Sequence, residues 1–527
     1  MCVSVLEKIF LYSVLLFFSC KSKTNFDGAA ASIDLKRGDI VSCGPQDGEM
    51  FGSVSFTATV PSALQKDFNI AVALLHSFEY DEAEKMFAKV IDKAPNCAMA
   101  YWGVAMSNFH SLWVPPNAAE LKKGVQALHI ARSIANKTKR ESDYIEAAAQ
   151  FFEHADQLDH RSRVLKFEKA MESIYERYPD DKEAAIFYAL ALNAAADPAD
   201  KTYAREKKAF NLLNPIFQQE PLHPGIAHYI IHSLDHPELA EMALPAARKY
   251  ASIAPASSHA QHMPSHIFTN LGLWDECIKS NLSAVASAKC YAEKAKIKGH
   301  WDEELHALDY LIYAYLQKKD DKLAKQELDY LQSINEVEPV TFKVAYAFAA
   351  GPARYALERK NWKEAATLQL HPANFPWDQF PWQKAIFHFA RLLGNVHGNN
   401  LPAAEKDLDT LKILYNALNG RENKANEAAQ VLIQIKASEA WIEFKNGNDE
   451  NALELMKAAA NSEDATEKHP VTPCAVIPAR ELLGDMLLEM NRPSLAVEAF
   501  EYDLKRHPNR RNGLLGLATA NRQIAMK

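Results

Sequence analysis

The chain of 527 residues lacks the short motifs by which many enzymes are recognised. It contains no Gly-rich phosphate loop, no Gly-x-Ser-x-Gly elbow, no His-Glu-x2-His helix and no Cys-x2-Cys pair. Nucleotide-binding proteins, esterases and zinc proteases depend on those spacings. Their absence removes the usual routes to these three functions.

Long basic stretches are missing as well. The formal net charge is −8, and the main short basic cluster is LysArgHisProAsnArgArg at 505–511. Binding a nucleic-acid backbone requires many clustered cations. We therefore predict no nucleic-acid partner and interpret this cluster as a solvated helix end.

Long hydrophobic runs are confined to the N-terminus. Lys8 precedes a mainly apolar run at 9–18, which is too short to span a bilayer, and Ser19 and Cys20 follow. This arrangement resembles a bacterial lipoprotein signal peptide over residues 1–19. The resemblance implies a lipid on Cys20 and a bacterial cell-envelope protein anchored in the inner or outer membrane, facing the periplasm or the cell surface. A plain secretory signal is the alternative.

Cysteines are few after that signal. Apart from the lipidated Cys20, the five that remain are an odd number without a close metal-type pair, so we predict no disulfide framework. A single pairing remains possible in an oxidising periplasm. These cysteines are Cys43, Cys97, Cys277, Cys290 and Cys474.

Residues 20–62 differ in composition from the rest of the chain. The polar, Gly-containing residues up to about 50 are typical of a tether that holds a domain away from a bilayer. The alternating run at 54–60 is the best strand candidate. We therefore predict a tether followed by a short extended segment.

Helical patterns dominate residues 63–527, and one spacing recurs. Ala83, Phe87, Val90 and Pro95 stand where a 34-residue helix-turn-helix unit places a small residue, an aromatic, an apolar residue and a helix-ending proline. The small alanine lets two helices approach, and the aromatic fills the groove between them. This spacing resembles the tetratricopeptide repeat (TPR).

The same spacing returns along the chain at 209–221, 243–255 and, most clearly, 483–508. Each such unit exposes an apolar face unless a neighbour stacks on it. We therefore predict an all-α, TPR-like superhelical solenoid of about nine helix-turn-helix units. An irregular helical bundle is the alternative.

Two aromatic loops interrupt the repeats. One contains Trp113, and the other contains Phe375, Trp377, Phe380 and Trp382 among several prolines. Aromatic rings held rigid by prolines could stack against sugar rings or a peptide. Alternatively, they fill a gap between units.

Histidine is concentrated in one part of the chain, with nine of the nineteen histidines between residues 223 and 306. An imidazole is costly to bury without a partner, so this crowding indicates metal, ligand or proton chemistry. His228 and His232 are four residues apart, as are His262 and His266, which places each pair on one face of a continuous helix. Two such pairs on neighbouring helices can supply four imidazoles.

Prolines affect this pattern. Pro237 directs His236 away from the first helix, and Pro264 puts the shared face of His262 and His266 in doubt.

Carboxylates accompany a fifth histidine on a strongly helical stretch. Glu303, His306 and Asp309 are three residues apart, and a Glu-x2-His with a nearby carboxylate is a ligand set for iron, manganese or zinc in helical cores. We predict a site for a transition metal, with zinc, iron or copper as candidates. Its ligands are His228, His232, His262, His266, His306, Glu303 and Asp309.

Two alternatives need no metal. Buried neutral histidines could hydrogen-bond the loops between repeats, with Asp235 capping or orienting one of them. They could also form a metal-free acid/base or ligand site.

Longer strings resemble a family of bacterial tetratricopeptide-repeat proteins without an established activity. They are HisTyrIleIleHis at 228–232, AlaProAlaSerSerHisAlaGlnHisMetProSerHisIlePhe at 254–268, HisAlaLeuAspTyr at 306–310 and ProAlaArgGluLeuLeuGly at 478–484. The resemblance covers nearly the whole mature chain. It implies a repeat fold in the cell envelope and carries over no catalytic residues.

Two hypotheses of function follow. In the first, the protein is a lipid-anchored scaffold whose concave face binds a protein, peptide or glycan, as an accessory to the capture or degradation of a nutrient such as a polysaccharide. In the second, it is a metal-dependent enzyme with a histidine cluster between repeats, where the metal lowers the pKa of bound water or activates an oxidant.

Overall fold

The computed structural model describes residues 28, 31–44, 50–110, 112, 114–421 and 424–526. The predicted signal 1–19, Cys20 and Trp113 lie outside these residues. In the described part of the chain every named element is a helix, and no helix there is both long and apolar enough to cross a bilayer.

Eleven consecutive helix pairs make up this part of the chain, and α25 (Arg511–Ala525) packs on the last pair. The first six pairs comprise α2 (Gln65–His76), α3 (Tyr80–Lys93), α4 (Ala98–Met106), α5 (Ala118–Ser133), α6 (Lys139–Phe152), α7 (His160–Arg177), α8 (Lys182–Ala194), α9 (Ala204–Gln219), α10 (Pro224–Ser233), α11 (Ala240–Ile253), and α12 (Ser258–His262) with α13 (Pro264–Asn270) against α14 (Trp274–Ala295). The other five comprise α15 (Asp302–Gln317), α16 (Asp321–Ser333), α17 (Phe342–Glu358), α18 (Trp362–Ala366), α19 (Pro381–His397), α20 (Leu401–Leu418), α21 (Ala425–Lys445), α22 (Asp449–Ala465), α23 (Ala479–Glu489) and α24 (Pro493–Arg506). Short 3-10 turns, η1 (Ser62–Leu64) and η2 (Trp377–Gln379), precede α2 and α19.

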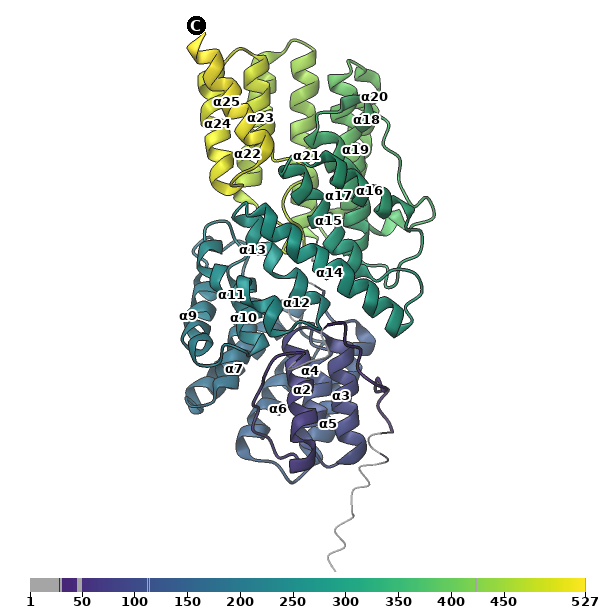
Figure 1. The fold of residues 1–527 in the computed structure, drawn as a ribbon, viewed down its shortest axis with the longest axis vertical. Coiled ribbons are helices and arrows are strands. Elements are labelled where there is room, and N and C mark those ends of the chain that lie inside the picture. Colours follow the sequence, from purple (N-terminus) through teal and green to yellow (C-terminus); the bar gives the residue numbers. More distant parts are fainter. Residues whose placement is uncertain are drawn as a thin grey trace, which may run out of the picture.

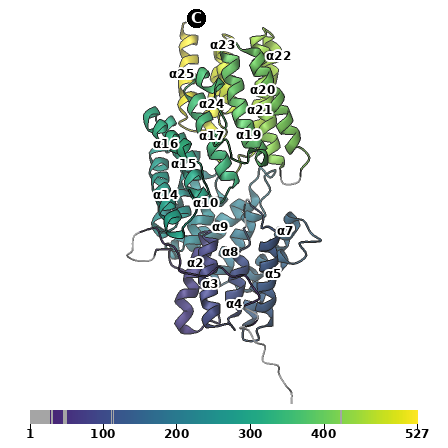
Figure 2. The same ribbon diagram turned by 90° about the vertical axis from the view of Figure 1, so that its right-hand side faces the viewer.

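Each helix contacts the next one along the chain, so the pairs form a TPR-like solenoid. Both views place α2–α5 at one end, α19–α25 at the other, and α10 and α14 between them (Figures 1 and 2). The predicted fold class is confirmed.

The repeat spacing acts through an aromatic ring packed on glycine. Phe87 of α3 is buried against Gly103 of α4, where a Cβ would fall within the phenyl ring. The last repeat repeats this arrangement, because Phe500 of α24 lies against Gly484 of α23 and Gly516 of α25. Glycine is needed at these positions because the ring occupies the volume of a side chain.

The structure contains two more helix pairs than the spacing identifies, α4/α5 and α6/α7. The loop at 107–117 separates α4 from α5 and is longer than a repeat turn. In α7, the buried Phe167 stands where the spacing expects a small residue, and its ring packs on Phe109 of that loop. Because a phenylalanine replaces the small residue of the repeat spacing, the sequence pattern does not identify this unit.

Residues 31–44, which we predicted to be a tether, instead lie along the folded domain. Ile33 and Leu35 are buried in the core, and Cys43 forms a disulfide with Cys290 of α14. The polar composition concealed these two apolar anchors. We call residues 31–44 the N-terminal strap.

The predicted strand at 54–60 is also absent, although its alternation has a structural meaning. Val54 and Phe56 are buried while Ser55 and Thr57 are exposed. Side chains occupy the main-chain acceptors here, since Gln65 Nε2 donates to Phe56 O at 3.1 Å and Arg140 Nη1 donates to Thr57 O at 2.6 Å, and no ladder forms. The alternating sequence pattern correctly predicted which side chains are buried, but the strand that it also predicted does not form.

Two hydrophobic cores meet in the middle of the solenoid. One is built from the strap and the helices up to α14, and the other from α14 and the helices after it. Tyr310 and Tyr313 of α15 belong to the first core, whereas their neighbours Leu308 and Leu311 belong to the second. The histidine-rich helices α10, α12, α13 and α15 lie at this junction.

Candidate metal centre

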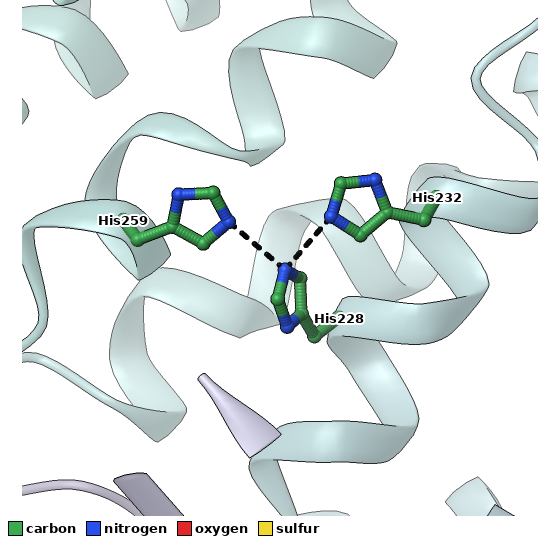
Figure 3. A group of neighbouring side chains, drawn as sticks. All are labelled: His228, His232 and His259. Carbon is green, nitrogen blue, oxygen red and sulfur yellow. Dashed lines mark hydrogen bonds between the residues drawn. The ribbon is translucent and has the colours of Figure 1, made fainter. Parts of the chain in front are cut away.

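Helices α10 and α12 bring three imidazoles together, and we call His228, His232 and His259 the first triad. His228 Nε2 lies 2.9 Å from His232 Nε2 and 3.1 Å from His259 Nε2. Figure 3 shows the His228 ring directed between the other two, one from its own helix and one from the facing helix. The predicted pairing of His228 with His232 is therefore present, with a third ring added.

Close packing of α10 on α2 sets the position of His228. Pro224 begins α10, and Gly225 lies against the ring of His76, where a Cβ would approach Nδ1 to 2.6 Å. This contact lets His228 Nδ1 reach the backbone oxygen of His76 at 2.6 Å. A carbonyl oxygen only accepts, so His228 carries its proton on Nδ1 and presents the Nε2 lone pair to the triad.

Helices α12, α13 and α15 form the second triad, His262, His266 and His306. His262 Nε2 lies 3.1 Å from His266 Nε2, and the rings of His262 and His306 are 4.2 Å apart at their centroids. Pro264 ends α12 and begins α13 without separating the two histidine side chains. The doubt that Pro264 raised about this pair is resolved in favour of a shared face.

Hydrogen bonds around the second triad fix its protons. Asn281 Nδ2 donates to Cys277 O at 2.8 Å, so Asn281 Oδ1 faces His262 Nδ1 at 2.7 Å. Asp235 Oδ2 lies 2.9 Å from His266 Nδ1. An amide oxygen and a carboxylate only accept, so both Nδ1 atoms carry the proton.

A neutral imidazole protonated at Nδ1 has a lone pair on Nε2. In the second triad two such lone pairs face each other across 3.1 Å, which is a repulsive arrangement in a buried site. A cation bound between the two nitrogens would turn this repulsion into attraction. Metal–nitrogen bonds of about 2.0 Å place neighbouring ligand nitrogens of a tetrahedron about 3.3 Å apart, close to the spacing found here.

All six histidines are held neutral. Burial lowers the pKa of His228 to about 3 and lowers the pKa of each of the other five rings. Lys343 further lowers the pKa of His262 and His306, and Lys468 that of His232. Neutral imidazole is the form that binds a metal.

Asp235 holds the second triad from outside. Its Oδ1 accepts from Asn270 Nδ2 at 2.7 Å, and its Oδ2 accepts from Lys468 Nζ at 2.8 Å as well as from His266. Burial by itself raises the pKa of Asp235, but Lys468 and His266 together lower it below its ordinary value. An ionised carboxylate on the far nitrogen of a histidine is the usual support of a metal ligand.

The two carboxylates predicted as ligands lie outside both triads. Glu303 forms an ion pair with Lys343, and Asp309 forms a buried ion pair with Arg354. Their spacing from His306 is that of a ligand set, but α17 supplies a cation to each of them. The sequence could not reveal these partners, which are about forty residues away along the chain.

His259 was not among the predicted ligands, although it completes the first triad. It precedes His262 by three residues and so lies one turn earlier on α12. The three-residue interval between His259 and His262 is the available sequence signal, because residues three apart also share a helical face. His236, as predicted, leaves the helix, and its Nδ1 lies 3.3 Å from Glu467 Oε2.

A third group of potential ligands combines two histidines with a carboxylate. Glu183 accepts from His76 Nε2 and from His223 Nε2, each at 3.0 Å. Here each Nε2 atom meets a carboxylate oxygen instead of another lone pair, and His76 Nδ1 lies 2.9 Å from Tyr229 Oη. We assign this group a structural role, because His76 also supplies the carbonyl oxygen that orients His228.

A pocket of 180 Å³ leads from the surface to the first triad. Its rim includes the exposed Pro198 and Pro470, and its inner wall includes His232 and Asp235. The volume corresponds to about six water molecules at about 30 Å³ each. A small molecule could therefore approach the edge of the first triad.

Charged side chains line the same pocket. Glu206 is buried in its wall, and burial raises the pKa of this carboxyl. Glu467 is different, because although burial raises its pKa, His236 and Lys201 lower it to about 2. With Lys468 also in the wall, the pocket combines a proton acceptor of raised pKa with fixed charges of both signs.

The second aromatic loop is not an exposed platform. Trp377 and Trp382 are buried, and Phe375 and Phe380 stack on each other at 5.5 Å while half-buried. Trp377 Nε1 donates to Pro372 O, and the Trp377 ring packs on Phe387 of α19. The structure favours the alternative in which this loop fills a gap between units.

Comparison with known proteins finds likeness only at the level of the fold. No family model matches the chain, and no curated protein sequence matches it. Yeast Tom70 is 12% identical with a TM-score of 0.34 and covers 87% of this chain and 88% of its own. A human IFIT1 dimer with m7Gppp-AAAA is 12% identical, with a TM-score of 0.37 and coverage of 86% and 95%.

The TPR domain of P58(IPK) is likewise 12% identical, with a TM-score of 0.21 and coverage of 88% and 99%. These scores are too low to transfer a ligand or an activity. The helix pairs and their aromatic-on-glycine packing by themselves give the chain a TPR-like helical-repeat fold.

Proposed function

We propose that this protein is a metalloprotein that binds transition-metal ions at its two histidine triads. The observation that carries the proposal is the pair of opposed lone pairs on His262 Nε2 and His266 Nε2, 3.1 Å apart. Asn281 and Asp235 fix the protons on the other nitrogens, so the rings cannot relieve this repulsion by exchanging tautomers. A bound cation converts the repulsion into two ligand bonds.

The pocket supports an enzymatic role. A metal held by three imidazoles keeps a coordination position free for water or substrate, and the pocket reaches the first triad at His232. Glu206 in its wall is a candidate proton acceptor, because its raised pKa lies closer to neutral pH. We propose that a small polar molecule meets the metal here.

Elemental analysis of protein purified without an affinity tag tests the metal proposal. We expect a near-stoichiometric transition metal in the parent protein and a clear loss in His262→Asn and His266→Asn. Asparagine keeps a side-chain donor toward the partner of Nδ1 and removes the Nε2 ligand. His129→Asn, at an exposed position of α5, is the matched control.

The opposite result is equally clear. Only traces of every transition metal after reconstitution with zinc, iron and copper, with no difference between the parent and His262→Asn, would refute metal binding and leave the histidines a purely structural role.

We also propose that the chain is lipid-anchored at Cys20 in a bacterial cell envelope. The disulfide between Cys43 and Cys290 supports this setting, because disulfides persist in oxidising compartments outside the cytosol. Labelled palmitate should enter the full chain expressed in a bacterium, and Cys20→Ser should abolish the label. Label retained by Cys20→Ser would contradict anchoring at this residue.

Capture of a glycan, peptide or protein on the concave face is left with less support. The aromatic side chains predicted to contact such a ligand are largely committed to packing, as Trp377 illustrates. The proposed metal sites are supported by more specific contacts.

A further inference from the structure

We infer that the two triads form one dinuclear centre and that its ions are a pair of Cu(I). This inference rests on the proposed metal binding and adds to it the number, identity and charge of the ions. It is argued from the placement of six rings on shared helices and from the absence of anionic ligands among them.

Helix α12 contributes a ligand to each triad. His259 belongs to the first triad and His262 to the second, and they are three residues apart on α12. Three residues of helix rise about 4.5 Å, so the two groups of ligand atoms lie about one turn apart. His266 of the second triad follows on α13.

The position of Asp235 agrees with this proximity. Asp235 follows the first-triad helix α10, and its Oδ2 lies 2.9 Å from His266 Nδ1 of the second triad. One side chain therefore connects the end of the helix that carries His228 and His232 with the second triad.

The ligand set excludes several metals. In both triads of the described chain the ligands are imidazoles alone, because Glu303, Asp309 and Asp235 are each bound to a cationic side chain. Magnesium, calcium and manganese require oxygen ligands, and paired iron sites in helical bundles use bridging carboxylates. Imidazole suits copper and zinc.

Charge distinguishes copper from zinc. Six neutral imidazoles cannot compensate two buried dications, whose mutual repulsion is large when little water screens it. Glu303 is paired with Lys343 and Asp235 with Lys468, so neither carboxylate offers the dications an uncompensated negative charge. Cu(I) is monovalent, so two of these ions place half as much charge in the same site.

A titration of the metal-free full chain tests this inference. Under anaerobic conditions we expect two Cu(I) per chain, measured against a chromophoric Cu(I) chelator. With Zn(II) we expect one ion at most at comparable excess, because the second dication meets the field of the first. His232→Asn and His306→Asn should each reduce the copper to one ion, and His129→Asn should keep two.

Proximity has its own measurement. Two neighbouring Cu(I) ions repel each other, so the parent should bind its second ion more weakly than its first, measured by competition with the same chelator. The single ion left in His232→Asn or in His306→Asn has no neighbour and should bind more tightly than the parent's second ion. This gain in affinity must appear in both variants if the repulsion arises between the triads.

The possible failures are distinguishable. Two Cu(I) that bind the parent as tightly as they bind the two single-triad variants would overturn the dinuclear centre and leave metal binding intact. Two Zn(II) bound as readily as two Cu(I) would overturn the charge argument. No binding of either metal would overturn the proposed function itself.

Discussion

Two buried polar clusters of this protein differ in how their donors and acceptors are matched. Arg510, at the start of α25, donates through Nε and Nη2 to both oxygens of Glu481 at 2.8 and 2.9 Å. Its Nη1 contacts Tyr313 at 3.1 Å and Glu358 at 2.8 Å. In the second histidine triad, by contrast, His262 and His266 direct acceptors at each other.

The contrast separates a cluster that folding completes from one that folding leaves incomplete. In the arginine cluster each charge has a partner of opposite sign within the chain, as buried charges require. In the second histidine triad, the two Nε2 lone pairs that face each other offer no donor to one another, and a cation between them would match both. Buried polar groups are thus informative about function when their hydrogen-bond roles conflict.

The largest expected effect on stability comes from removing Arg510, the cation of the arginine cluster. Arg510→Ala leaves Glu358 and Glu481 buried without a counter-charge and should lower the free energy of unfolding by about 3 to 5 kcal/mol. Urea denaturation of metal-free protein measures this loss. Arg522→Ala, at an exposed position of the same helix, should change little; equal stability of the two variants would contradict the account of this cluster.

Metal binding should stabilise the fold through the two histidine triads and independently of the arginine cluster. At a free metal concentration one hundred times the dissociation constant, binding should stabilise the fold by about 2.7 kcal/mol. Thermal unfolding of the parent with and without metal measures the gain. The gain should remain in Arg510→Ala and shrink in His262→Asn, and an equal gain in all three proteins would place the metal elsewhere.

Asp235, which contacts His266, should affect metal affinity more than Glu303 and Asp309, the carboxylates predicted as ligands from the sequence. Asp235→Asn removes the charge that supports the His266 ring and should weaken metal affinity by about 10- to 100-fold. Glu303→Gln, which removes one of the two carboxylate partners of Lys343, is the control and should leave the affinity unchanged. A larger loss in Glu303→Gln would restore Glu303 as a ligand.

Acid should destabilise the metal-free protein through its neutral histidines. Because burial lowers the pKa of His228 to about 3, the unfolded chain binds a proton between about pH 6.5 and pH 3 that the folded chain does not. Stability therefore falls as the pH falls through that window, by at most about 1.4 kcal/mol per pH unit for this ring. Unfolding measured between pH 7 and pH 5 should show a shallower slope in His228→Gln.

His129→Gln, at an exposed position, provides the reference for that slope. If His228→Gln and His129→Gln follow the same pH dependence as the parent, then His228 is not kept neutral by the fold.

The sequence predicted the solenoid well because its repeat residues act locally. Phe87 and Phe500 mark the same packing position in units more than four hundred residues apart, and both lie on glycine as the spacing requires. The strap escaped prediction because only two of its apolar residues, Ile33 and Leu35, are anchored in the core. Composition averages over a segment and hides such isolated anchors.

The sequence predicted most histidines of the two triads, but not how they are divided between the triads. His228, His232, His262, His266 and His306 converge, because consecutive repeats bring their helices face to face. The division into two triads, the role of His259 and the loss of Glu303 and Asp309 to cations depend on contacts between distant helices. No local spacing encodes the position of Lys343 or Arg354 on α17.

The bond between Cys43 and Cys290 gives the chain the form of a lariat. It closes a ring with a sequence separation of 247, which contains α2 through most of α14, and it leaves the rest of the polypeptide as a tail. Every histidine of the two triads belongs to the ring except His306, which lies at the beginning of the tail. An ion held by the second triad would therefore act as a clasp that fastens the tail to a covalently closed loop.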